Sequence, residues 1–169
     1  PGTRFVTLGG AVANDVHGKN HHVAGSFGCH VRALGLLRSD GAALTCSLQD
    51  NAALFAATIG GLGLTGIIAW VEIQLTPIAS SDMEAENRRF ASLEDFFDLS
   101  AASSDWPYVV AWLDCPSPRG RGIFSRARHA PDGPLRAAAP TGPSLPLTPP
   151  VNLVNGLSLR AFNTLYYHR

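Results

Sequence analysis

One stretch of the chain, residues 5–31, holds four of the six histidines and five of the 17 glycines, and its order constrains the local fold. The apolar and β-branched residues 5–8 predict a buried strand. The pair Gly9-Gly10 predicts a sharp turn close to another group, because neither residue carries a Cβ. Residues 11–16 predict one or two helical turns. A helix that begins directly after such a turn directs free N–H groups at whatever lies above the strand, which suits an anion or the edge of a flat ring.

The remainder of the first half alternates strand and helix signals. Residues 31–37 and 43–46 predict a hairpin around a turn at Ser39-Asp40-Gly41. Residues 52–58 predict a helix that Asp50 or Asn51 caps, and residues 65–75 predict a long strand that Pro77 closes. This order favours an α+β layer, one sheet with helices on one side.

The second half predicts further sheet strands and two helices. A helix over residues 93–102 follows Ser92, with Phe96, Phe97 and Leu99 directed inward. Seven of the twelve prolines lie in residues 131–150, which are therefore predicted to form a surface loop. The predicted strands span residues 82–90, 108–114 and 122–128, and Asn155 or Ser158 opens a last helix.

Composition excludes several classes of function. With 13 basic and 13 acidic residues the chain has no net field for nucleic acid or an anionic membrane. The 46% hydrophobic content supports a packed core, and no apolar run reaches the roughly 18–20 residues of a membrane span. Three widely spaced cysteines indicate a reducing compartment, the cytoplasm by default. Because we interpret the chain as an internal piece of a longer protein, a membrane-associated or periplasmic location stays open.

Two sequence blocks resemble a known family. The first is V-T-L-G-G-A-V-A-N-D-V-H-G-K-N-H-H-V-A-G-S-F-G, and the second, at residues 57–68, is A-T-I-G-G-L-G-L-T-G-I-I. Together they resemble the second half of the FAD-binding domain of the vanillyl-alcohol oxidase and p-cresol methylhydroxylase superfamily. The branch that looks most similar is the decaprenylphosphoryl-β-D-ribose 2-oxidase-like oxidoreductases, whose H-G-K-N-H-H and G-S-F-G are matched letter for letter. The resemblance is strong over residues 1–77 and moderate over residues 108–129.

This resemblance implies a fold and a division of the chain. Residues 1–78 would be the C-terminal part of a PCMH-type FAD-binding domain, with a mixed or antiparallel sheet and helices on one side. Residues 79–169 would begin an α+β substrate (cap) domain that includes the proline-rich loop 131–150.

The resemblance also implies site residues. His17 would lie at the flavin ring and hydrogen-bond a substrate hydroxyl, and Lys19 would face the substrate. In the alternative readings His17 only ends a helix and Lys19 is a solvated loop residue. The implied FAD contacts are Gly2, Thr7, Leu8, Gly9, Gly10, Asn14, Asp15, Val16, His17 and Ile68.

The implied reaction is oxidation of an alcohol carbon of a sugar, a sugar lactone or a polyprenyl-phosphosugar, by hydride transfer to FAD. The electron acceptor is open, no nucleic acid is expected, and a membrane would be contacted only through a lipid-linked substrate. The alternative is a flavin-binding or sugar-phosphate-binding domain without catalysis.

Two other patterns offer competing chemistry. His17, His21 and His22 form an H-x-x-x-H-H pattern that invites a zinc site, but no further ligand at a fixed spacing is evident, so we expect no metal. A basic run, of which Arg126 and Arg128 share one face of a predicted strand, is either a solvated face or a contact for a substrate phosphate.

Overall fold

The computed structural model describes the whole chain except residues 1, 4, 138–151 and 153. The chain divides into two compact units, Pro1–Pro77 and Ile78–Arg169, and each is described by itself. The roles predicted for the two parts, FAD binding and substrate binding, stay predictions. No helix in the described ranges combines the length and the apolarity that crossing a membrane requires.

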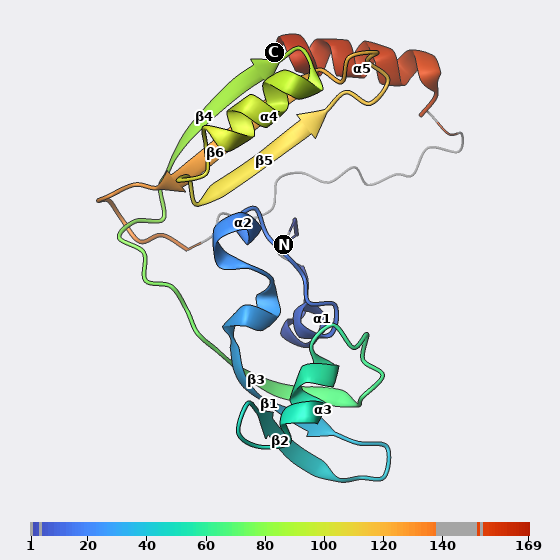
Figure 1. Cartoon of the computed structure of the whole chain (residues 1–169), viewed down its shortest axis with the longest axis vertical. Helices are drawn as coiled ribbons and strands as arrows, with labels where there is room; N and C mark the ends of the chain where they lie inside the picture. Colours follow the sequence, from blue (N-terminus) through green and yellow to red (C-terminus); the bar gives the residue numbers. More distant parts are fainter. Residues whose placement is uncertain (1, 4, 138–151, 153) are drawn as a thin grey trace. The chain divides into compact units, whose positions relative to one another are not determined.

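The first unit is built on a three-stranded antiparallel sheet in the order β2-β1-β3 (Figure 1). The predicted hairpin is confirmed: β1, Val31–Leu37, pairs with β2, Ala43–Ser47. The predicted long strand is β3, Ile67–Ile73, which pairs with the other edge of β1.

Four short helical segments accompany this sheet: α1 Leu8–Ala13, α2 His21–Ala24, the 3-10 turn η1 Phe27–His30 and α3 Ala52–Thr58. The prediction for α3 is confirmed in both bounds. The core of the unit joins α1 and α3 to the sheet through Val12, Leu34, Leu36, Cys46 and Phe55. Burial raises the pKa of the Cys46 thiol, which keeps this thiol protonated and unreactive.

The strand predicted at residues 5–8 is wrong. Phe5 and Val6 have no regular secondary structure, and the side chain of Phe5 is 76% exposed. Thr7 is instead the N-cap of α1, and Gly9 and Gly10 belong to this helix rather than to a turn. The β-propensity of these few residues gives way to the hydrogen bond by which the Thr7 side chain begins the helix.

The second unit contains another three-stranded antiparallel sheet, in the order β4-β6-β5. Its strands are β4 Met83–Phe90, β5 Tyr108–Leu113 and β6 Gly122–His129, close to the predicted ranges. Helix α4, Leu93–Ala101, covers one face, where the Phe96 ring packs 5.6 Å from Phe90 and 6.1 Å from Phe124. The predicted inward position of Phe97 is wrong, because its side chain is 64% exposed.

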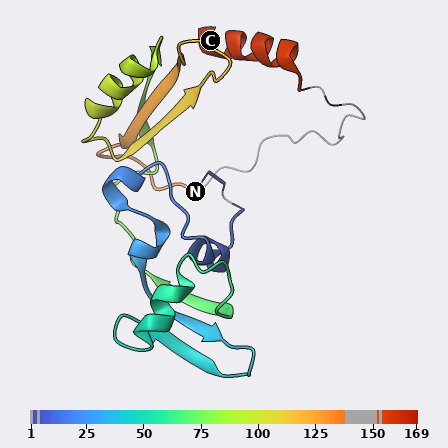
Figure 2. The same ribbon diagram turned by 45° about the vertical axis from the view of Figure 1, so that its right-hand side comes forward.

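Helix α5, Gly156–His168, lies at the end of the sheet where β4 and β5 end and β6 begins (Figure 2). Both predicted opening residues take part in its start, because the Asn155 side chain and Ser158 form a capping box. The Asn163 amide donates to the buried Asp114 carboxylate at 2.6 Å, and the Tyr167 hydroxyl donates to the Phe90 carbonyl at 3.3 Å. These bonds attach α5 to the sheet.

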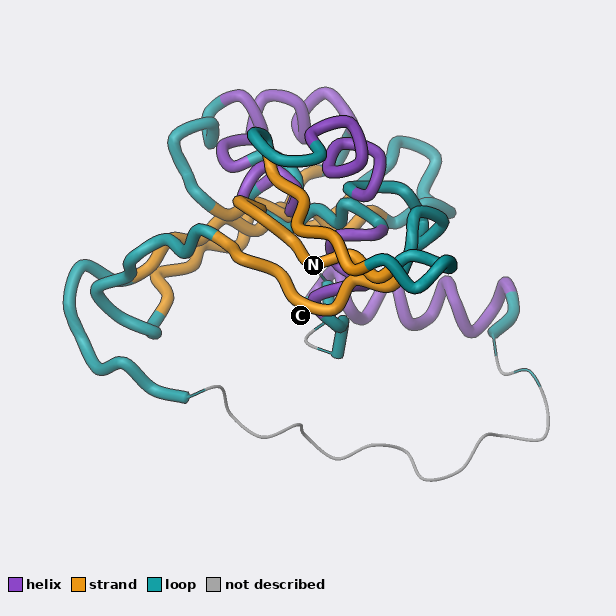
Figure 3. Tube along the Cα trace, turned by 90° about the horizontal axis from the view of Figure 1, so that it is seen from below, coloured by secondary structure: helices purple, strands orange, loops and turns teal. Residues whose placement is uncertain are grey.

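Helices and antiparallel strands therefore occur in both units, which is an α+β architecture (Figure 3). The proline-rich loop predicted over residues 131–150 lies outside the described residues from residue 138 on.

Candidate functional site

Helix α1 carries the first glycine-rich block and is held at both ends. The Thr7 hydroxyl oxygen accepts a hydrogen bond from the Gly10 N–H at 3.0 Å. At the other end the Gly60 N–H donates to the Val12 carbonyl at 3.0 Å, and the Leu62 N–H donates to the Ala13 carbonyl at 2.8 Å. The second glycine-rich block is thus hydrogen-bonded directly to the end of the helix formed by the first.

Gly9 brings the two blocks into contact. A Cβ built on Gly9 would lie 3.6 Å from the Ile68 Cβ and 3.8 Å from the Ile68 carbonyl oxygen, so α1 and β3 approach closely here. Two parts of the expected cofactor site, the α1 backbone and Ile68, therefore lie side by side, although some sixty residues separate them in sequence. Gly2 lies outside this cluster in irregular structure, and nothing lies within 4 Å of where its Cβ would be.

The surface at the start of α1 suits a flat, largely apolar ligand. Thr7 and Leu8 are exposed residues, and Gly9 and Gly10, which have no side chain, are partly exposed, so the main chain of the two glycines is accessible from outside the unit. Leu8 and the preceding Phe5 expose large apolar side chains. The Gly10 N–H and carbonyl are already bonded to Thr7 and Asn14, so the hydrogen-bonding groups offered here are the N–H groups of the first helical turn before Gly10. Together with the exposed apolar side chains they suit a flat ring such as isoalloxazine or adenine.

Three of the other predicted cofactor residues have structural contacts of their own. Asp15 has a left-handed backbone, φ 42°, and its carboxylate accepts a hydrogen bond from the Gly28 N–H at 2.7 Å. The Val16 carbonyl accepts from the Phe27 N–H at 2.8 Å, and Asn14 donates from its side chain to the Gly10 carbonyl at 2.9 Å. The N-D-V segment thereby fixes the loop that follows it.

His17 and Lys19 lie in this loop, and both are exposed. His17 forms an isolated antiparallel bridge with Ser26, and its ring lies 5.3 Å from that of His21, measured between centroids. The His21 Nδ1 lies 3.0 Å from the Gly18 carbonyl oxygen, so the loop closes on itself. Lys19 has no hydrogen bond or ion pair with another described residue, which leaves its ammonium group available to a ligand.

Among the described residues, no group of three or more His, Cys, Asp or Glu side chains is placed to hold a metal ion. His21 directs its Nδ1 to a backbone carbonyl instead.

The basic run of the second unit is largely neutralised on the α4 side of the sheet. Arg126 pairs with Glu86 at 2.7 Å and lies over the Trp106 ring, 4.5 Å from its centroid. Arg128 pairs with Glu84, also at 2.7 Å. The hydrogen bond from Arg126, the largest cause, lowers the pKa of Glu86. Both arginines belong to an ion-paired surface; the Arg128 side chain is 57% exposed, as a solvated face predicts, whereas that of Arg126 is only 12% exposed.

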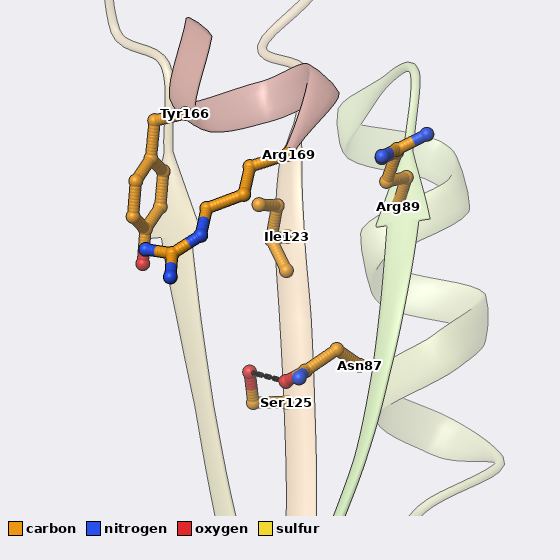
Figure 4. Close-up of a pocket in the computed structure, with 6 residues that line it drawn as sticks. All are labelled: Asn87, Arg89, Ile123, Ser125, Tyr166 and Arg169. Carbon is orange, nitrogen blue, oxygen red and sulfur yellow. Dashed lines mark hydrogen bonds between the residues drawn. The ribbon is translucent and has the colours of Figure 1, made fainter. Parts of the chain in front are cut away.

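Sequence reasoning missed a hollow on the opposite face of the same sheet. Its lining residues are drawn in Figure 4, and its volume is about 760 Å³. Detecting it requires the pairing register of β4 with β6 and the position of α5, neither of which local sequence patterns specify. It is lined by Asn87, Arg89, Ile123, Ser125, Tyr166 and Arg169.

Comparisons with known proteins give the family. No family model matches the chain. Over its whole length the chain is 38% identical to the decaprenylphosphoryl-β-D-ribose oxidase of Mycolicibacterium smegmatis, of which it spans 40%. Over 89% of its length it is 40% identical to an uncharacterized protein of Streptomyces coelicolor, of which it spans 44%. The chain thus spans less than half the length of these relatives.

A part of the chain is similar to a more distant relative. Over 43% of its length it is 38% identical to the L-gulonolactone oxidase of Mus musculus, of which it spans 16%. The chain belongs to the vanillyl-alcohol oxidase and p-cresol methylhydroxylase superfamily of FAD-linked oxidoreductases. Within that superfamily it is a relative of the decaprenylphosphoryl-β-D-ribose 2-oxidase-like proteins, and the cofactor of these proteins is FAD.

Proposed function

We propose that this chain is part of an FAD-dependent oxidoreductase that oxidises an alcohol carbon of a sugar, a sugar lactone or a polyprenyl-phosphosugar. The observation that carries the proposal is the contact of Gly9 with Ile68 beside accessible backbone at Thr7–Gly10. It supports a cofactor surface formed by both family motifs at once. The first unit would then bind the flavin, and the second would contribute to the substrate site.

The residues of this chain would bind the cofactor, orient the substrate and move protons. The backbone of Thr7, Leu8, Gly9 and Gly10 would contact the flavin. The Ile68 main chain would form hydrogen bonds on the adenine side of FAD. When bound, FAD would supply the acceptor for the hydride that leaves the alcohol carbon.

In this proposal His17 hydrogen-bonds the substrate hydroxyl and can take up its proton, because an imidazole nitrogen can act as a general base. Lys19 stabilises negative charge on a substrate oxygen, since its ammonium group has no competing carboxylate among the described residues. The loop contacts at Asp15 and His21 position both side chains.

The test mixes the full-length protein anaerobically with candidate polyols, sugar lactones and polyprenyl-phosphosugars in a stopped-flow instrument. Reduction of the flavin is monitored as loss of its visible absorbance. We expect at least one substrate class to bleach the flavin. His17→Ala should slow this reduction by about 100-fold or more, the usual contribution of a general acid or base. His168→Ala, the same change at an exposed histidine of α5, is the control and should leave the rate unchanged.

The alternative, a flavin-binding domain without catalysis, predicts a yellow protein that no substrate class bleaches. A colourless full-length protein that nevertheless binds sugar phosphates would favour a sugar-phosphate-binding domain and contradict the proposed function.

A further inference from the structure

The two faces of the β4-β6-β5 sheet differ in charge. On the α4 face, Glu84 and Glu86 are paired with arginines of β4 and β6. The pairing register places Asn87 opposite Ser125 and Arg89 opposite Ile123 on the other face. At the alternating positions of the three strands that share this open face, the described residues include no aspartate or glutamate. The open face therefore carries positive charge that the sheet itself does not neutralise.

Two guanidinium groups line the hollow on this face. Arg89 is held by a hydrogen bond from its Nη2 to the His168 carbonyl oxygen at 2.9 Å, which orients the group and leaves other N–H donors free. Arg169 follows α5 and reaches across the face beside Tyr166 (Figure 4). No described carboxylate lies within ion-pair distance of either arginine.

Among the neutral side chains of the hollow, Asn87 adds N–H donors, whereas the Ser125 and Tyr166 hydroxyl oxygens can also accept. The Ser125 hydroxyl donates to the Asn87 Oδ1 at 2.6 Å, drawn as the dashed line in Figure 4. The amide oxygen is thus occupied, and the amide N–H groups of Asn87 remain available. Ile123 and the Tyr166 ring provide an apolar and aromatic wall.

We propose that this hollow binds the phosphate group of a phosphomonoester. Two guanidinium groups and a free amide N–H give the lining a positive, donor-rich character that selects an oxyanion. Figure 4 draws Arg89 and Arg169 on opposite sides of Ile123, so the phosphate would bind the oriented Arg89 guanidinium, which matches phosphate oxygens in pairs, and Arg169 would add positive charge. A phosphomonoester carries about −1.5 to −2 charges at neutral pH, which balances two arginines better than a single carboxylate does. The volume of about 760 Å³ leaves room for the organic group attached to the phosphate, against Ile123 and Tyr166.

The site is independent of the proposed function, because the phosphate of a polyprenyl-phosphosugar is a diester and the ligand proposed here is a monoester. Phosphate binding itself requires no redox chemistry, so it is measured separately from flavin reduction. Titration calorimetry of the full-length protein with glycerol 1-phosphate at low salt should show binding that weakens as salt is raised. Arg89→Gln should weaken this binding at least about tenfold, the usual effect of losing a hydrogen bond to a charged group.

Arg88→Gln is the matched control. This arginine neighbours Arg89 in sequence, but it lies on the α4 face and pairs with Glu86, so phosphate affinity should change less than about twofold. Because Arg89→Gln also removes the bond to His168, Asn87→Asp serves as a second variant. It keeps the acceptor oxygen for Ser125 and introduces a negative charge, and it should abolish binding while circular dichroism stays unchanged.

A sedimentation assay with phosphatidic acid vesicles distinguishes a lipid headgroup from a small molecule. Binding to the vesicles but not to glycerol 1-phosphate, lost in Asn87→Asp, assigns the site to a lipid headgroup. Binding to the soluble ester assigns it to a small molecule. Absence of both, or equal weakening by Arg88→Gln and Arg89→Gln, overturns the phosphate site. A flavin that substrates still bleach in that case would leave the proposed function standing.

Discussion

Gly9 illustrates how single residues bring the two motifs together. Inside a helix a glycine costs roughly 0.5–1 kcal/mol relative to alanine, so its presence in α1 requires a reason. Packing does not supply it, because a Cβ at this position would meet Ile68 at an ordinary contact distance of 3.6 Å; the accessible backbone supplies a reason that concerns a ligand. Asp15 shows the complementary case: its left-handed backbone is held by the hydrogen bond that its carboxylate accepts from the Gly28 N–H.

The Glu86 carboxylate predicts a measurable dependence of stability on pH. Because Arg126 lowers the pKa of Glu86 in the folded state, the pair stabilises the fold above the ordinary glutamate pKa of 4.5. This contribution is lost as the pH falls through the lowered pKa. In urea unfolding at pH 7, the free energy of unfolding of the wild type should therefore exceed that of Glu86→Gln. The difference between the two should disappear toward pH 3.

Arg126→Gln is the control for this prediction. It removes the largest cause of the lowered pKa of Glu86. It should therefore reduce the loss of free energy of unfolding between pH 7 and pH 3. If wild type and Glu86→Gln lose stability in parallel from pH 7 to pH 3, the ion pair is not the cause of the acid-dependent loss.

At the scale of elements, local signals predicted most of the fold. The Ser39-Asp40-Gly41 turn specified the β1–β2 hairpin, and the apolar run 52–58 specified α3. The strand at residues 5–8 failed because four residues of β-propensity cannot outweigh a side-chain cap and packing against β3. Candidate site residues came from the family motifs, whereas the hollow of the second unit depends on contacts between distant elements and left no local signal.

We predict that the buried polar contact of Asp114 keeps helix α5 ordered. Asp114, 3% exposed, accepts from the Asn163 amide at 2.6 Å and from the Arg121 Nε at 2.9 Å. Asp114→Ala would leave both donors unpaired and should destabilise the second unit by about 3–5 kcal/mol. Hydrogen exchange monitored by mass spectrometry should show loss of protection across Gly156–His168 before α4.

Thr164→Ala is the matched control for α5. Thr164 is exposed and accepts only a long hydrogen bond, 3.4 Å, from Arg121. The prediction fails if this variant loosens α5 as much as Asp114→Ala does, or if α4 and α5 lose protection together.

At the scale of the whole molecule, the chain combines two α+β units of a superfamily of FAD-linked oxidoreductases. The first unit supplies accessible backbone at α1 and the loop with His17 and Lys19. The second supplies a sheet with one face covered by α4 and ion-paired, and an open face that is positively charged. The family and its cofactor follow from the relatives, and the assignment of flavin contacts to particular residues is what remains to be measured.

The most direct measurement is the flavin content of the full-length protein and of its Gly9→Ala variant, read from the visible absorption spectrum after gel filtration. A Cβ at position 9 meets Ile68 at an ordinary contact distance of 3.6 Å, so the fold should persist and gain roughly 0.5–1 kcal/mol from better helix propensity. The added methyl group would occupy the space between the α1 backbone and Ile68, the two groups that are proposed to contact FAD. We predict a yellow wild type and a variant that is at least as stable but loses several-fold of its flavin; a colourless wild type, or a variant with full flavin content, would contradict this account.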